Sequence, residues 1–161
     1  MYDGIAYSAL WKLMAWLPPF LIRWKFTKEA LAARVRIDVR NRPHAVQING
    51  GEISDATTWL TIQNAGYFPV QLDRLTLTLT LGGVPLDFYH LTRVSIPVDK
   101  MHELFLRDPL NPGLISHIKR NLKNGEIVSA SIDAEFNSDI HNFSVRVPHI
   151  SGISYRAINF D

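Results

Sequence analysis

Six histidines are the residues with the most evident chemical potential in this 161-residue chain, because neutral imidazole serves both as a general base and as a metal ligand. No two of them share the i, i+4 spacing of a helical metal site, and the HExxH pattern of zinc proteases is absent. We therefore expect no metal. A hydrolase would need a histidine and a carboxylate brought together by folding, and that alternative stays open for His90, His102, His141 and His149.

Other catalytic motifs are also absent. The chain has no cysteine, which excludes thiol catalysis, thiolate metal ligands and disulfides. No GxSxG nucleophile motif occurs, and the pairs Gly50-Gly51 and Gly82-Gly83 are typical of hairpin turns rather than of phosphate-binding loops. We therefore predict a protein that is not an enzyme, with no cofactor and no small-molecule substrate.

Basic side chains gather in the first quarter of the chain. Residues 1–43 carry eight basic and three acidic side chains, a net charge of +5, whereas the rest carries nine basic and twelve acidic ones, a net charge of −3. Anionic lipid attracts such a cluster with about 1 kcal/mol per basic residue near the surface. The side chains that we expect to bind an anionic surface are Lys12, Arg23, Lys25, Lys28, Arg34 and Arg36.

The segment from Ile5 to Ile22 contains one charge, Lys12, and is interrupted by Pro18-Pro19. Its unbroken part would rise about 20 Å as a helix, less than the hydrocarbon core of about 30 Å. We therefore expect a monotopic anchor, a helix that lies in the plane of the membrane interface and is followed by a basic stretch. The expected interface side chains are Tyr7, Leu10, Trp11, Met14, Trp16, Leu17, Phe20 and Trp24.

Three alternatives remain for this segment. It would serve as a signal peptide if Ala30-Leu31-Ala32 were a cleavage site. It would be an ordinary helix if it packed on the rest of the domain or on another subunit. If it spans the bilayer as a kinked hairpin, the basic flank that follows it places the body in the cytoplasm by the positive-inside rule.

Beyond residue 33 the dominant period is two, which predicts strands with one face in an apolar core. The clearest example is Leu75–Leu81, in which leucine alternates with threonine. One helix is expected from Pro112 to Lys123, with Asn111 as its N-cap and Asn124-Gly125 as its stop. This helix should close one end of an antiparallel β-sandwich. The other expected strands lie at 35–39, 46–48, 57–63, 94–98, 128–136, 143–147 and 154–160.

The block from Asn64 to Leu72, NAGYFPVQL, leads into the long Leu/Thr strand and its Gly82-Gly83 turn. It resembles the type 2 late-embryogenesis-abundant domain, also called the water-stress and hypersensitive-response (WHy) domain, although Ala65 stands where that family usually has proline. The resemblance implies a seven-stranded immunoglobulin-like sandwich with one helix, often tethered to a membrane, without enzymatic activity. From the residues themselves we expect Asn64 to cap its loop and Gly66 to adopt a left-handed conformation.

These observations predict two parts, an N-terminal aromatic and basic segment over 1–28 and a β-sandwich domain over 29–161. The predicted function is a membrane-associated, non-enzymatic protein whose body, on the cytoplasmic side, acts as a structural or partner-binding subunit of a larger assembly. Its expected partners are an anionic membrane surface and a protein partner or a homo-oligomer. Two alternatives are a nucleic-acid-binding module, which the long aliphatic side chains among the Trp and Arg residues disfavour, and a sandwich that holds an apolar ligand.

Overall fold

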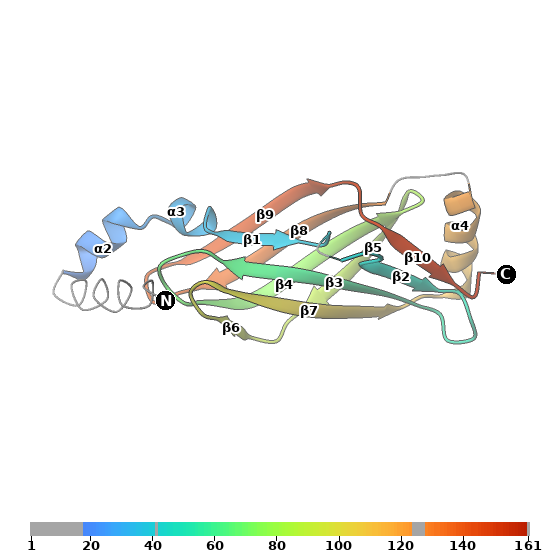
Figure 1. Cartoon of the computed structure of the whole chain (residues 1–161), viewed down its shortest axis with the longest axis horizontal. Coiled ribbons are helices and arrows are strands. Elements are labelled where there is room, and N and C mark those ends of the chain that lie inside the picture. The colour runs from blue at the N-terminus through green and yellow to red at the C-terminus, as the bar shows by residue number, and fades with distance from the viewer. Residues whose placement is uncertain (1–17, 41, 124–127, 161) are drawn as a thin grey trace.

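The computed structural model describes residues 18–160, except residues 41 and 124–127. Two β-sheets face each other, and helices lie at both ends of the sandwich that they form (Figure 1). The predicted β-sandwich is therefore confirmed. The helices are α2 (Pro19–Lys25), α3 (Lys28–Ala32) and α4 (Pro112–Lys123).

The first sheet is built around β3, the strand that carries most of its pairings. On one side β3 pairs antiparallel with β1 and β2 in succession, and on the other side it pairs with β7 over its whole length. The last strand, β10, lies parallel to β2. The strands of this sheet are β1 (Val35–Asp38), β2 (Val46–Asn49), β3 (Asp55–Asn64), β7 (Lys100–Pro109) and β10 (Tyr155–Ile158).

The second sheet is built around β4 in the same manner, and all its pairings are antiparallel. One side of β4 pairs with β6 and β5, and the other side pairs with β8, which in turn pairs with β9. The strands of this sheet are β4 (Val70–Leu81), β5 (Val84–His90), β6 (Val94–Ile96), β8 (Ser129–Asn137) and β9 (Asn142–Ile150).

The described residues thus contain ten strands, and the expectation of seven is wrong. Two strands that the sequence analysis did not predict are β5 and β7. In β7 the core-facing Leu104 and Leu106 flank Phe105, which is exposed on the outer face. Because an apolar side chain occupies a solvent-facing position, the period-two pattern of this strand is hidden.

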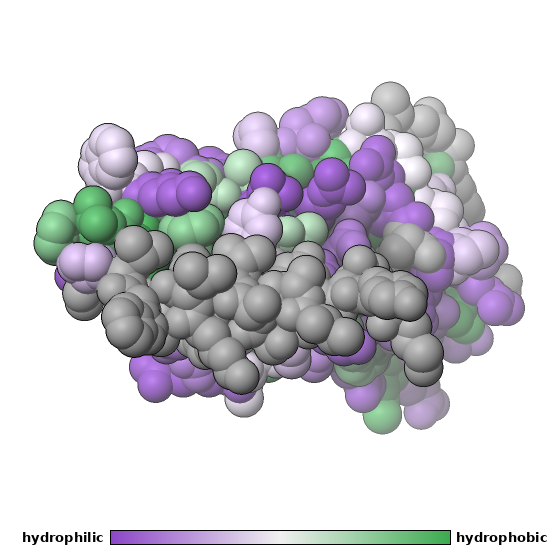
Figure 2. Space-filling view, turned by 60° about the vertical axis from the view of Figure 1, so that its left-hand side comes forward, coloured by the Kyte–Doolittle hydropathy of each residue, from purple (hydrophilic) through white to green (hydrophobic). Residues whose placement is uncertain are grey.

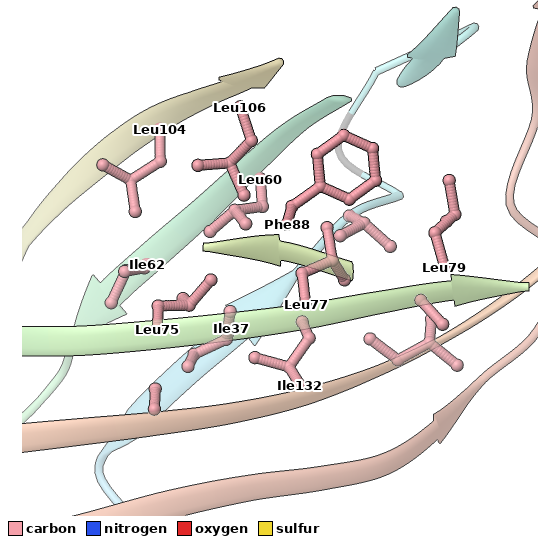
Figure 3. Packing of buried hydrophobic residues seen from close by; sticks show 14 of the residues in the cluster. Ile37, Leu60, Ile62, Leu75, Leu77, Leu79, Phe88, Leu104, Leu106 and Ile132 are labelled. Atoms are coloured by element: carbon pink, nitrogen blue, oxygen red, sulfur yellow. The ribbon is translucent and has the colours of Figure 1, made fainter. Parts of the chain in front are cut away.

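The core forms where the inner faces of the two sheets meet (Figure 3). Leu77 of β4 and Ile132 of β8 point toward Leu60 of β3, and Phe88 of β5 fills the side of the cluster. All four side chains are buried. The leucines of the Leu/Thr strand supply the inner face of β4, as their spacing predicts, because successive side chains of a strand point to opposite faces.

Helix α4 begins and packs as its sequence predicts. The Asn111 side-chain oxygen accepts a hydrogen bond of 2.8 Å from the Leu114 N–H, which confirms the predicted N-cap. The Asn121 side chain donates to the carbonyl of Gly82 in the turn between β4 and β5, so the helix covers that end of the sandwich. The turn has positive φ angles at Gly82 and Gly83 (54° and 74°), which suit a two-residue hairpin. The predicted stop of the helix, Asn124-Gly125, lies outside the described residues.

Candidate functional site

Helix α2 is apolar on two sides, and this is the feature that marks the opposite end of the molecule as a candidate site. Ile22 and Phe26 pack against the hydrophobic core. The exposed side chains of the helix include Phe20 and Trp24, which are 68% and 80% exposed, together with Leu21. Since residues four apart lie on one face of a helix, Phe20 and Trp24 form an aromatic surface that the sandwich does not cover.

The inner side of α2 is held to the sandwich by aromatic contacts. The ring of Phe26 meets the ring of Phe68 edge-on at a centroid distance of 4.9 Å, and the ring of Tyr67 at 5.8 Å. Both partners lie in the loop between β3 and β4. The predicted boundary at residue 28 stays a prediction, but residues on its N-terminal side, Ile22 and Phe26, touch the core of the body.

Asn64 organises the loop that receives Phe26. Its buried side chain donates to the carbonyls of Phe68 (2.9 Å) and Ile96 (3.1 Å) and accepts from the Gly66 N–H (2.9 Å), which confirms the predicted cap. The left-handed conformation predicted for Gly66 is wrong, because its φ is not positive. Glycine fits there for another reason, since an added Cβ would lie 2.9 Å from the Asn64 side-chain oxygen.

The predicted basic residues separate into three groups. Arg23 and Lys25 lie exposed in the last turn of α2, beside the aromatic surface, and the guanidinium of Arg34 lies 5.3 Å from the centroid of the Tyr67 ring. These three residues share one end of the sandwich, which we call the α2 end. Lys28 begins α3, and Arg36 lies on the exposed face of β1.

A hollow of about 430 Å³ lies beside Lys28, between α3 and the strands β4, β8 and β9. Its charged lining consists of Lys28 and three acids, Glu29, Asp73 and Glu135. Because the acids outnumber the base, the hollow does not suit a phosphate group.

Further apolar side chains, which the sequence pattern did not indicate, are exposed near the α2 end. Tyr67 lies in the loop against Phe26, and Met101 follows Lys100, which is opposite Asn64 in the pairing of β3 with β7. Figure 2 turns this end of the molecule toward the viewer and shows hydrophobic surface gathered at one edge of the face. Because the alternation in β7 is hidden, no sequence signal marked Met101 as an exposed side chain.

The remaining predicted interface residues lie outside the described part of the chain. Within residues 18–160, no helix is both long enough and apolar enough to cross a bilayer. The residues outside the described part are Tyr7, Leu10, Trp11, Lys12, Met14, Trp16 and Leu17.

Three of the histidines contact backbone groups or an arginine, whereas the Nε2 of His90 is buried and has no hydrogen-bond partner among the described residues. His141 lies 3.3 Å from the carbonyl of Arg23, His44 lies 3.3 Å from that of Tyr155, and His117 lies 3.1 Å from the guanidinium of Arg120. Among the described residues, the ion pairs within 4.0 Å all involve arginine, and no three His, Asp or Glu side chains are grouped as metal ligands would be.

Comparison with known proteins identifies the fold. No family model and no curated protein matches the chain. Among solved structures, the Northeast Structural Genomics Consortium target SoR45 matches with a TM-score of 0.51 at 12% identity, over 76% of this chain and 87% of that chain. The putative ApaA protein from Bordetella pertussis has a TM-score of 0.46 at 13% identity, over 75% of this chain and 91% of that chain.

PapD-like domain 7 of human CEP192 matches with a TM-score of 0.40 at 12% identity, over 77% of this chain and 87% of that chain. At these identities a likeness concerns the fold alone, and of the three only SoR45 exceeds a TM-score of 0.5. Together with the two facing sheets, the comparison shows that the chain is a β-sandwich protein.

Proposed function

We propose that this protein is a membrane-associated, non-enzymatic β-sandwich that rests on anionic lipid through its α2 end, while the sandwich serves as a subunit of an assembly. The observation that carries the proposal is the doubly apolar helix α2. The inner side chain Ile22, together with Phe26 directly after the helix, secures it to the core. Its outer side chains, Phe20 and Trp24, therefore have no structural task in the sandwich.

The residue types of this surface favour a bilayer interface. The amphipathic ring of tryptophan favours the headgroup level, and burial of a phenylalanine or leucine side chain contributes about 1.5–3 kcal/mol. Arg23 and Lys25 lie beside these rings, and each adds about 1 kcal/mol near an anionic surface. The combined free energy suits reversible binding in the interface plane.

The same charges favour the cytoplasmic side for the body of the protein. The cytoplasmic leaflet carries anionic lipid, and the basic residues of α2 lie between the predicted apolar segment and the sandwich. The finer fold assignment, an immunoglobulin-like sandwich akin to the type 2 late-embryogenesis-abundant domain, belongs to the same proposal. Its support is the loop that Asn64 closes and the helix α4 between β7 and β8.

A vesicle flotation experiment with the full chain tests the proposal. The wild type should float with vesicles of phosphatidylcholine and phosphatidylserine, less with phosphatidylcholine alone, and less at high salt because salt screens exposed charges. The double variant Phe20→Ser/Trp24→Ser should lose most of this binding. Its matched control is Ile53→Ser, which removes an equally exposed apolar side chain from the loop between β2 and β3, at the other end of β3.

A second pair of variants tests the charges. Lys25→Glu and Arg120→Glu each reverse one exposed basic residue in the last turn of a helix, α2 in the first case and α4 in the second. Lys25→Glu should weaken flotation with anionic vesicles, and Arg120→Glu should leave it unchanged. Wild-type protein that stays in the soluble fraction, or equal losses at the two ends of the sandwich, would contradict the proposal.

A further inference from the structure

Strand β7 has a free edge. Within residues 18–160, β7 pairs with β3 and with no other strand. The Trp59 N–H donates to the Ala45 carbonyl on the opposite side of β3 (3.0 Å), and Trp59 is the residue across from Phe105. Because pairs in an antiparallel ladder alternate, the backbone N–H and C=O of Phe105 point away from β3. By the same alternation, the backbone N–H and C=O groups of Met101, Glu103 and Arg107 also point away from β3.

The side chains of these residues cover the outer face of the strand. Phe105 is 53% exposed and its ring lies 5.0 Å from that of Trp59, whose other neighbour is the guanidinium of Arg42 at 5.1 Å. Glu103 forms an ion pair with Arg42, and Arg107 pairs with Asp55 at 2.6 Å. An acid and a base therefore flank Phe105 at equal distances along the free edge.

We propose that β7 pairs antiparallel with β7 of a second copy of this chain, about a two-fold axis through Phe105. In this register Phe105 faces Phe105 of the second copy, and Glu103 faces Arg107 of the second copy. The charge pair forms twice because the interface is symmetric. Hydrogen bonds then satisfy the outward N–H and C=O groups of all three residues in both chains, and the two β3–β7 sheets become continuous.

The charge pattern selects this register over its neighbours. A shift of two residues one way places Glu103 across from Phe105, and a shift the other way places Glu103 across from Pro109, which has no N–H to donate. A shift of one residue turns every side chain to the wrong face. The register that places Glu103 across from Phe105 pairs opposite charges only near the strand ends, at Lys100 and Asp108. The register centred on Phe105 instead pairs Glu103 with Arg107 at the middle of the strand, and a directly opposed charge pair stabilises a sheet by about 0.2–1 kcal/mol.

The same symmetry favours a second copy over a foreign strand. Charged residues on an edge strand usually oppose the pairing of sheets. In β7 the acid and the base lie symmetrically about Phe105, so that two identical strands attract each other. The inference rests on the proposed role of the sandwich as a subunit of an assembly, and it does not depend on the binding of lipid by α2.

Single-cysteine crosslinking of the full chain in detergent solution tests the register, since the natural chain has no cysteine. In the Phe105→Cys variant the two Cα atoms should lie about 5.5 Å apart, within the range of a disulfide. In the matched control Met101→Cys, also on the exposed face of β7, they should lie about 27 Å apart. Mild oxidation should therefore yield a covalent dimer at position 105 and none at position 101.

Charge reversal tests the pairing without cysteine. In the Glu103→Arg dimer each new arginine faces Arg107 of the other copy, and in the Arg107→Glu dimer each new glutamate faces Glu103 of the other copy. Each variant therefore has two like-charge pairs and should dimerise about tenfold more weakly than the wild type. A mixture of the two variants restores both opposite-charge pairs and should dimerise as the wild type does. Sedimentation measures the masses, and thermal unfolding confirms that each variant is folded.

A monomeric wild type, crosslinking at position 101 as efficient as at position 105, or single charge variants that remain dimeric would overturn the inference. A folded chain whose β7 captures only a peptide from another protein would overturn it as well. Flotation with anionic vesicles separates this result from the proposed membrane role, because the β7 variants should float as the wild type does. Failure of flotation with intact dimers would contradict the lipid proposal alone.

Discussion

The two ends of the sandwich each carry a helix, but the two helices bury their apolar side chains to different degrees. Helix α4 places Ile115 and Ile118 in the core and leaves Ser116 and Arg120 exposed. Helix α2 also directs apolar side chains to the core, yet its outer side carries Phe20 and Trp24. Helix α4 therefore buries its apolar side against the sandwich, whereas α2 has an aromatic side that the sandwich does not cover.

The helix starts differ in the same way. Asn111 caps α4 with its side chain, while α2 begins after Pro18 without a side-chain cap. A capped amphipathic helix is specified by its own residues. The seven-residue α2 depends instead on its contacts with Phe68 and Tyr67 through Phe26, because so short a helix is marginal alone in water. The difference is that α4 is specified by its own cap and apolar stripe, whereas α2 is held by contacts outside the helix.

The largest expected effect contrasts the two helices directly. Ile118→Ala removes a side chain that is 0% exposed and should lower the free energy of unfolding by about 2–5 kcal/mol. Trp24→Ala should change it by less than about 0.5 kcal/mol, because the side chain is exposed. Urea unfolding followed by circular dichroism without lipid measures both, and equal losses would remove the distinction between the ends.

The next effect concerns the loop that supports α2. Asn64→Ala leaves the carbonyls of Phe68 and Ile96 and the N–H of Gly66 without this partner, so the free energy of unfolding should fall by about 3 kcal/mol. Amide hydrogen exchange in α2 should also accelerate. The neighbouring Gln63→Ala, at an exposed position, is the control and should have little effect. Unchanged exchange in α2 would separate that helix from the Asn64 loop.

A smaller effect is expected at the start of α4. Asn111→Ala removes the hydrogen bond to the Leu114 N–H and should cost about 1 kcal/mol, whereas Asn111→Ser keeps an N-cap oxygen and should cost less. Urea unfolding again provides the measurement. If both variants behaved as the wild type, α4 would be held by packing alone, as we infer for α2.

The smallest effect is a pH dependence at α3, which joins α2 to the sandwich. A hydrogen bond from the backbone N–H of Glu29 itself and one from the Thr27 side chain lower the pKa of the Glu29 carboxyl below its ordinary value of 4.5. The charged form therefore adds stability above pH 4.5, and this stability is lost as the pH falls through the lowered pKa. Glu29→Gln should remove that part of the decline in stability below pH 4.5, as measured by urea midpoints. A wild-type decline that persists unchanged in the variant would assign it to other carboxyls.

Local signals explain which parts of the fold could be predicted. The Leu/Thr alternation of β4, the Gly82-Gly83 turn and the Asn111 cap each depend on residues adjacent in the sequence. The free edge of β7 and the pairing of Trp59 with Phe105 depend on which strands become neighbours, and those residues lie far apart in the sequence. Periodicity contains no information about strand partners, so the candidate dimer surface was not predictable from it.

The candidate membrane surface shows the same division. The types of Phe20, Trp24, Arg23 and Lys25 predict an interface, and these side chains are exposed in the structure, but the interface itself stays a prediction. The structure alone placed Arg34 over Tyr67, and it separated Lys28 into an acidic hollow. A linear cluster of charge cannot reveal this separation, because the folding of α3 against β9 and the course of β1 decide where each basic residue lies.

By itself, the sequence determined the β-sandwich class, the helix that closes one end and the aromatic, basic character of the other, since composition, alternation and capping act over a few residues. Only the tertiary structure decided which apolar side chains remain in water. Ile22 is packed and Trp24 is exposed although they are two residues apart in one helix. The physical reason is that burial depends on the surfaces that folding brings together, here the loop of Asn64 and the inner faces of the two sheets.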